Sequence, residues 1–254
     1  MTVRPAAATV FNDMLEDAAS LVVRGSTVGA FELKKFEHLI GQLGSADRSG
    51  AIEMRAHVAA ARDQFDEVDA LYSRAIAATE DYVGAIVRYI LVLSKTGQAL
   101  KLGDVADRYM ESIKLVPSAY QAVGEALTCA GWIVRGRQIE AASGAPEARE
   151  SPGVDVPMDG FEERDIAAAV GFSHQFLRKR GAKAVGIRTS GIAHDDGPAQ
   201  VLVELQVDQP VSVVSDLEWD LLAALGEAAF PIEQHGPLVL SLSTAGSGIS
   251  GYAD

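Results

Sequence analysis

Residues 65–78 read FDEVDALYSRAIAA, and apolar side chains in this stretch recur every three or four residues, as on one face of an α-helix. The same register recurs in the flanking segments, where an aromatic residue is followed four residues later by isoleucine. The aromatic residues are Phe36, Tyr72 and Tyr109, and the isoleucines are Ile40, Ile76 and Ile113. A period of 36 to 37 residues is typical of stacked helical hairpins, each of which buries its apolar face against its neighbours.

Helical spacing of apolar residues extends on both sides of this stretch. Short segments rich in Gly, Ser, Asp or Pro separate the expected helices, and helices joined by such short links pack as antiparallel hairpins. The expected helices cover residues 9–23, 30–43, 52–61, 65–78, 82–96, 102–115 and 118–134. Residues 1–142 are therefore predicted to form an all-α domain of helical hairpins.

The middle unit of this domain resembles the tetratricopeptide family. The residues that match the packing positions of that family are Ala56, Ala59, Phe65, Tyr72 and Ala75, followed in the next unit by Tyr109 and Pro117. The match is degenerate, and it covers roughly residues 9–142. The departures from the family pattern are Val68 at a small position, Asp63 at a glycine position, Glu80 at the terminal proline, and a truncated fourth unit.

The resemblance implies a groove, lined by the first helix of each hairpin, that binds peptides or protein surfaces. Candidate partner-binding residues in such a groove are Arg55, Arg62, Arg88 and Lys95, whose cations would bind an acidic segment or a terminal carboxylate. Two alternatives stay open. The helices can form an irregular bundle with coincidental spacing, and the four cations can belong to ordinary solvated helix faces.

A different pattern begins after residues 143–160, which contain three prolines and three glycines and read as a linker. Residues 183–193 and 201–207 are predicted to form a β-hairpin, because apolar residues alternate in the second segment and Asp196-Gly197 favours a turn. Helices are expected at 161–180 and 215–229, and a last strand at 237–243. The order α-β-β-α-β predicts a small α+β domain over residues 161–243, whose helices cover one sheet face, followed by a flexible tail at 244–254.

The charge of the chain is −13, with 22 Lys and Arg against 35 Asp and Glu, so general nucleic-acid binding is not expected. No Lys or Arg follows Arg188, and acidic residues such as Asp216, Glu218 and Asp220 are candidates for contact with a basic partner. Solubility alone explains them equally well. A predicted helix ends in the cluster Arg178, Lys179 and Arg180, and the helix dipole stabilises cations at this end. The cluster is alternatively a contact to the helical domain or a binding site for an anion.

Sequence motifs for catalysis are weak. Residues 246–251 match G-x-G-x-x-G without a following helix, and His194-Asp195-Asp196 is a poor metal site without a second ligand cluster. The single cysteine, Cys129, is predicted to be a buried structural thiol. We therefore expect no catalytic residue, no metal and no cofactor. The absence of an apolar secretory core or of an uncharged run of roughly 18 residues predicts a cytoplasmic protein without membrane segments.

These patterns favour a non-enzymatic protein-interaction module, such as an adaptor, a chaperone or an antitoxin-like or immunity-type protein. Its partner would bind the helical groove and the acidic α+β domain. The alternative is a small-molecule sensor or enzyme with a site between the two domains, for which His174, His194, Arg178 and Arg180 are candidates. A third possibility is a self-assembling subunit, with Trp132 and Ile133 at an interface rather than in the last core turn of the helical array.

Overall fold

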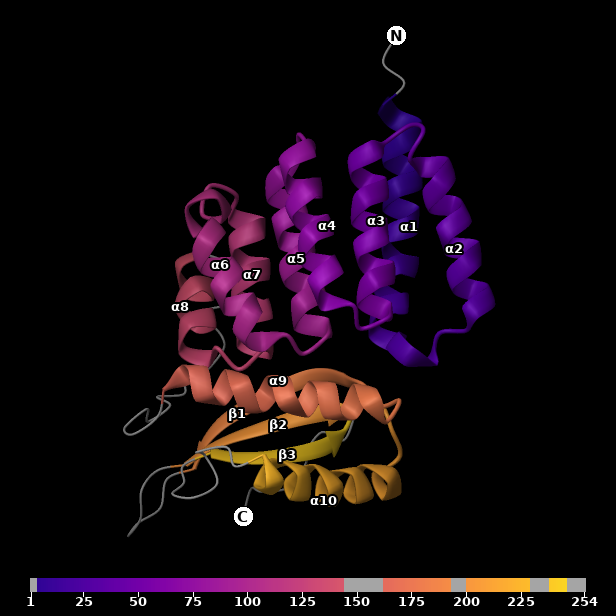
Figure 1. Cartoon of the computed structure of the whole chain (residues 1–254). Helices are drawn as coiled ribbons and strands as arrows, with labels where there is room; N and C mark the ends of the chain where they lie inside the picture. The colour runs from indigo at the N-terminus through magenta and orange to yellow at the C-terminus, as the bar shows by residue number, and fades with distance from the viewer. Residues whose placement is uncertain (1–3, 144–161, 193–199, 229–237, 246–254) are drawn as a thin grey trace.

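The computed structural model describes residues 4–143, 162–192, 200–228 and 238–245 (Figure 1). Most of the predicted linker at 143–160, the turn at His194 and most of the tail at 244–254 therefore lie outside the described residues. The first part of the chain is an array of four helical hairpins. Its helices are α1 (Arg4–Arg24), α2 (Ala30–Leu43), α3 (Arg48–Ala61), α4 (Phe65–Ala78), α5 (Tyr82–Lys95), α6 (Ala99–Ile113), α7 (Pro117–Cys129) and α8 (Ile133–Ser143), with a short 3-10 turn, η1, at Gly25–Thr27.

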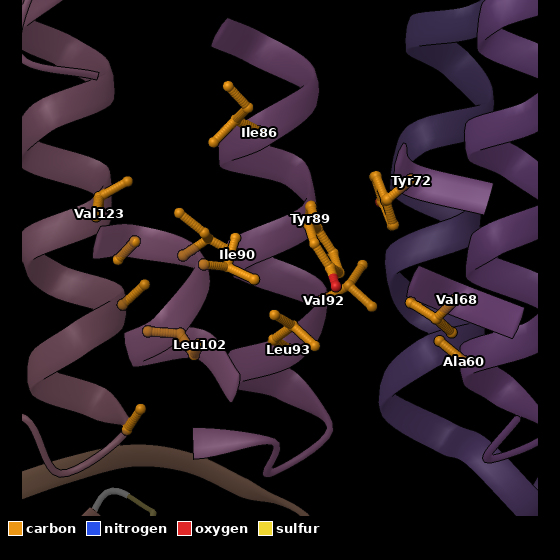
Figure 2. Close-up of a cluster of buried hydrophobic side chains, with 14 of the residues drawn as sticks. Ala60, Val68, Tyr72, Ile86, Tyr89, Ile90, Val92, Leu93, Leu102 and Val123 are labelled. Atoms are coloured by element: carbon orange, nitrogen blue, oxygen red, sulfur yellow. The ribbon is translucent and has the colours of Figure 1, made fainter. Parts of the chain in front are cut away.

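The residues that define the sequence repeat lie on the second helix of each hairpin and face the core. Tyr72 and Ile113 are fully buried, and Phe36 and Ile40 are nearly so. Figure 2 shows Tyr72 of α4 beside Tyr89 of α5, and their rings stack with centroids 4.7 Å apart. Stacking of this kind joins neighbouring hairpins, which matches the expectation that no hairpin buries its apolar face alone. The run of packed helices is thus confirmed, at the level of a helical array.

The repeat also appears in the turns inside the hairpins. The four residues with positive φ in these turns are Gly25, Asp63, Gly97 and Gly131, and the last three are spaced 34 residues apart. Asp63 adopts φ 58°, a left-handed conformation that Asp tolerates better than most non-glycine residues. The prediction of one continuous helix over residues 118–134 is wrong. The chain turns at Gly131 and forms the separate helices α7 and α8.

The second part of the chain is a three-stranded sheet with two helices, α9 (Glu163–Lys179) and α10 (Val211–Glu227). Strands β1 (Ala184–Ile192) and β2 (Gln200–Val207) pair antiparallel, as predicted, and β3 (Leu238–Thr244) pairs parallel to β2, giving the order β1-β2-β3. The fully buried Val203, Leu205 and Val207 share one face of β2 and pack in one cluster with residues of both helices. The predicted order α-β-β-α-β is therefore present.

Helix α9 joins the two parts of the molecule. Figure 1 shows it lying across the end of the helical array, with the sheet and α10 on its other side. One stripe of α9 contacts three of the turns with positive φ. From one end of the helix to the other, Ala167 packs at Gly131, Gly171 at Gly97, and Arg178 at Gly25. The adjacent face of α9, about 100° round the helix, places Ile166, Val170 and Leu177 in the core of the sheet. The α+β part is thus packed directly on the array.

Two imidazoles, that of the buried His57 and that of the partly buried His174, make this fold acid-sensitive. Burial lowers the pKa of His57 in α3 and of His174 in α9 to about 4, from 6.5 in the unfolded chain. The folded state binds these protons less tightly than the unfolded chain. The contribution of the neutral imidazoles to the free energy of unfolding is therefore fully present above pH 6.5 and is lost as the pH drops toward 4. We expect a loss of about 2 kcal/mol per imidazole at pH 5 relative to pH 8.

Denaturant unfolding between pH 8 and pH 5 measures this effect. His57→Gln and His174→Gln should each flatten the pH dependence of the free energy of unfolding, while His38→Gln, an exposed control on α2, should leave it unchanged. An unchanged slope in both buried variants would refute the assignment.

Candidate functional site

Arg178, predicted as an anion contact or as a contact to the helical domain, is engaged by the helical domain. Its side chain is 8% exposed, and its Nε donates to Asp63 Oδ1 at 2.8 Å. The two terminal nitrogens donate to the carbonyl oxygens of Val22, at the end of α1, and Ala60, at the end of α3. The guanidinium therefore caps two helix C-termini, where the dipole favours a cation, and its hydrogen-bonding groups are used inside the protein.

The other two cations of the cluster, Lys179 and Arg180, are exposed. Arg180 lies over the Phe176 ring, 3.7 Å from its centroid, and pairs with Asp220 of α10 at 3.4 Å. No ion pair of Lys179 is present among the described residues. The three cations do not converge on one point of the surface, so the anion-contact prediction stays a prediction for Lys179 and Arg180 alone.

A pocket of about 520 Å³ lies where the array meets the sheet. First helices of three hairpins form one wall, through residues that include Leu91 of α5 and Ala126 of α7. The opposite wall is the start of β1, residues 184–187, along an edge that no described strand covers. The pairing of β1 with β2 is irregular between Ala184 and Gly186, and Val185 at this bulge is exposed. Bulges re-aim side chains and often border binding sites.

Polar groups in the pocket come from both domains. Lys95 of α5, one of the predicted groove residues, lines it together with Cys129 of α7 and His174 of α9. Cys129 is exposed, so the prediction of a buried thiol is wrong. Desolvation and the nearby Glu140 and Glu125 raise the pKa of the thiol, which disfavours the thiolate that a nucleophilic cysteine needs.

The electrostatic state of the pocket at neutral pH follows from these groups. The His174 imidazole is neutral, and its Nε2 has no hydrogen-bond partner among the described residues. Lys95 forms no described ion pair, and desolvation lowers its pKa. Within the described part of the chain, no group of three or more His, Cys, Asp or Glu residues is placed to hold a metal ion.

The other three predicted groove residues do not join Lys95. Arg88 makes a bidentate ion pair with the buried Glu53, with Nε to Oε2 at 2.7 Å and a terminal nitrogen to Oε1 at 3.0 Å. Arg55 and Arg62 line a separate hollow of about 330 Å³ against α2, where Arg62 pairs with Glu37 at 2.7 Å. The structure thus distributes the four cations over three different environments.

The outer face of α10 carries several exposed apolar side chains. Trp219 is 75% exposed and Val211 is 69% exposed, and Leu222 is also exposed. Helical spacing places Leu222 on one flank of Trp219 and Asp216 on the other. Asp216, Asp220 and Glu227 lie along the second flank, and all three are exposed. A large aromatic residue in water next to a ridge of carboxylates is typical of an interaction surface.

One of the predicted acidic residues has a structural role instead. Glu218, on the side of α10 toward the sheet, accepts a hydrogen bond from the backbone N–H of Leu242 in β3, with N to Oε1 at 2.9 Å. Asp216 remains free of described partners, and Asp220 pairs with Arg180. Trp132 and Ile133, for which an interface was an alternative, are buried, and Trp132 Nε1 donates to the Ala99 carbonyl oxygen at 2.9 Å.

Sequence reasoning missed the two features that stand out in the structure. Trp219 falls on the polar side of the predicted helix stripe, a signal that was present in the spacing of Leu217, Leu221 and Leu225. The pocket has no such signal, because its walls come from segments far apart in the chain.

Comparison of the chain with models of known protein families, with curated proteins and with solved structures finds no match.

Proposed function

We propose that the chain is a protein-interaction module whose outer α10 face binds a basic, amphipathic segment of a partner protein. The observation that carries the proposal is the 75% exposure of Trp219 beside a carboxylate ridge. Aromatic side chains in this setting bury large area at a small entropic cost, and tryptophan is among the residues that most often dominate binding energy. The absence of Lys and Arg after Arg188 favours a basic partner over an acidic one.

The chemistry of the surface sets the form of the partner. Apolar side chains on one side of the bound segment would pack on Trp219, Leu222 and Val211. Lysine or arginine on its other side would pair with Asp216 and Glu227. Charge attraction of this kind raises the association rate, and it weakens as salt screens the carboxylates.

Fluorescence anisotropy with two labelled synthetic peptides tests the proposal. Both peptides carry leucines at helical spacing, and lysines in the first are replaced by glutamates in the second. We expect the lysine peptide to bind the full-length chain, and Trp219→Ala to weaken this binding by about 30-fold, the effect of losing a dominant contact. A matched control is Phe31→Ala, which removes an 84% exposed aromatic residue from α2.

Charge and position are separated by further variants. Asp216→Asn combined with Glu227→Gln should weaken binding mainly at low salt, since exposed charges are screened at high salt. Equal binding of the lysine and glutamate peptides would overturn the proposal. An unchanged affinity in Trp219→Ala, or an equal loss in Phe31→Ala, would also overturn it.

A further inference from the structure

The pocket between the array and β1 is independent of the α10 face and has the composition of a small-molecule site. Its volume of about 520 Å³ falls in the range of roughly 300–1,000 Å³ that is common for such sites. Its walls are mainly apolar, and include Leu91, Ala122 and Ala126 from the array and Ile187 from the sheet. A few polar groups on apolar walls fix the orientation of a ligand and set its class.

The charges around the pocket single out one cation. Lys183 and Glu125 also line it. Lys183 pairs with Asp208 at 3.7 Å, while Glu125 accepts a hydrogen bond from the neutral Gln121 amide at 3.0 Å and keeps its negative charge. Lys95 has no such partner among the described residues. Lys95 is exposed, so its ammonium is open to a ligand, and an anion that paired with it would oppose the lowering of its pKa by partial burial.

His174, which lines the same pocket, carries a polar atom that is unpartnered among the described residues. The His174 Nε2 atom is shielded from solvent and has no hydrogen-bond partner in the described chain. Buried polar atoms are satisfied in the large majority of cases, so the unpartnered Nε2 calls for a partner such as a bound water or ion. His174 and Lys95 come from α9 and α5, so the site exists only because the two parts of the molecule pack together.

We propose that this pocket binds a small carboxylic acid with an apolar body, whose carboxylate pairs with the Lys95 ammonium. One ammonium suits a single negative charge. A phosphate dianion would need several converging donors, because a buried charge is costly unless it is paired and hydrogen-bonded. The apolar body would pack on the wall of α5 and α7 and on the start of β1. The site is distinct from α10, so a negative result for ligand binding in this pocket would leave the proposed interaction surface on α10 untouched.

The single cysteine provides a direct measure of occupancy. Cys129 is exposed and lines the pocket, so a bound ligand should slow its alkylation by the neutral reagent N-ethylmaleimide. The probes are octanoate and octanamide, which share an apolar chain and differ in charge. We expect octanoate at millimolar concentration to slow alkylation in a saturable manner, and octanamide to do so with at least about tenfold lower affinity.

Three variants test the charge and the free space of the pocket. Lys95→Met should abolish the preference for octanoate over octanamide, while Lys34→Met, an exposed control on α2, should preserve it. Ala126→Leu fills the cavity and should abolish protection by both probes with Lys95 in place. The ratio of rates with and without probe is compared within each variant, since a substitution can change the intrinsic reactivity of the thiol. Titration calorimetry gives the affinities independently.

Two outcomes would overturn the proposal. The first is that neither probe slows the alkylation of Cys129 or gives a heat of binding. The second is that octanamide protects as well as octanoate, or that Lys95→Met keeps the preference for the acid, because then Lys95 does not select the ligand.

Discussion

Replacement of Arg178 by methionine is expected to lower the free energy of unfolding by about 3 kcal/mol, because two backbone carbonyl oxygens lose hydrogen bonds to a charged donor, while Asp63, which is 44% exposed, keeps its hydration. The side chain is 8% exposed and serves Asp63 and two helix C-termini at once. Methionine fills similar space but removes the guanidinium donors to the carbonyl oxygens of Val22 and Ala60, and Ala60 keeps only the longer bond from the Asp63 backbone N–H at 3.2 Å. Denaturant unfolding of the purified variant measures the change.

Two further variants show whether this effect depends on the position of the guanidinium. Lys179→Met removes the adjacent, exposed cation and should change stability by less than about 0.5 kcal/mol. Gly25→Ala should destabilise, because its Cβ would lie 2.6 Å from the Arg178 guanidinium and the residue has φ +50°. A loss in Lys179→Met equal to that in Arg178→Met would contradict the assignment, since it would indicate a general effect of charge.

The helical array could be predicted from the sequence because its information is local. Residues 30–43 and 65–78 were expected as helices and occur with those bounds, since their apolar periodicity and flanking turn residues agree. The break between α7 and α8 was missed because Leu127, Ala130 and Ile133 continue a helical stripe through Gly131. At Gly131 the turn packs against α9, next to the Cα of Ala167. The apolar periodicity within residues 118–134 does not show this contact with a distant helix.

The placement of charged residues could not be predicted for the same reason. Arg88 and Arg178 have the sequence context of surface cations, but each binds a carboxylate from a distant segment, Glu53 and Asp63 respectively. Lys95, in a similar context, has no such partner and lines a pocket. Whether a cation is structural or available to a ligand depends on which helices become neighbours, and that is a property of the tertiary packing.

Arg88 gives the second large effect, and its pH dependence identifies the cause. Arg88→Met leaves the carboxylate of Glu53, which is 1% exposed, without its cation. We expect a loss of about 3–5 kcal/mol at pH 8. Burial already raises the pKa of Glu53 above its ordinary value of 4.5, and the loss of Arg88, which opposes that shift, raises it further.

The sign of the pH dependence follows from this shift. An acid whose folded-state pKa is raised binds its proton more tightly in the folded state, so its contribution is favourable at low pH and is lost as the pH rises through the folded pKa. The stability difference between Arg88→Met and the unmodified chain should therefore shrink from pH 8 to pH 5. Taking this difference at each pH cancels the acid-sensitivity that both proteins owe to His174. The contribution of His57 also changes, because Arg88 helps to lower the pKa of that imidazole, and a His57→Gln background removes this second effect.

A double variant completes the test. Glu53→Gln with Arg88→Met leaves a neutral amide in place of the buried charge, and should recover much of the stability at pH 8. The stability of this double variant relative to the unmodified chain should be the same at pH 5 as at pH 8. Denaturant unfolding of both variants at the two pH values provides the measurement. If Arg88→Met loses the same stability at pH 5 as at pH 8, the cost comes from lost packing, including the contact of the guanidinium with the Phe11 ring at 5.2 Å, and not from an unpaired carboxylate.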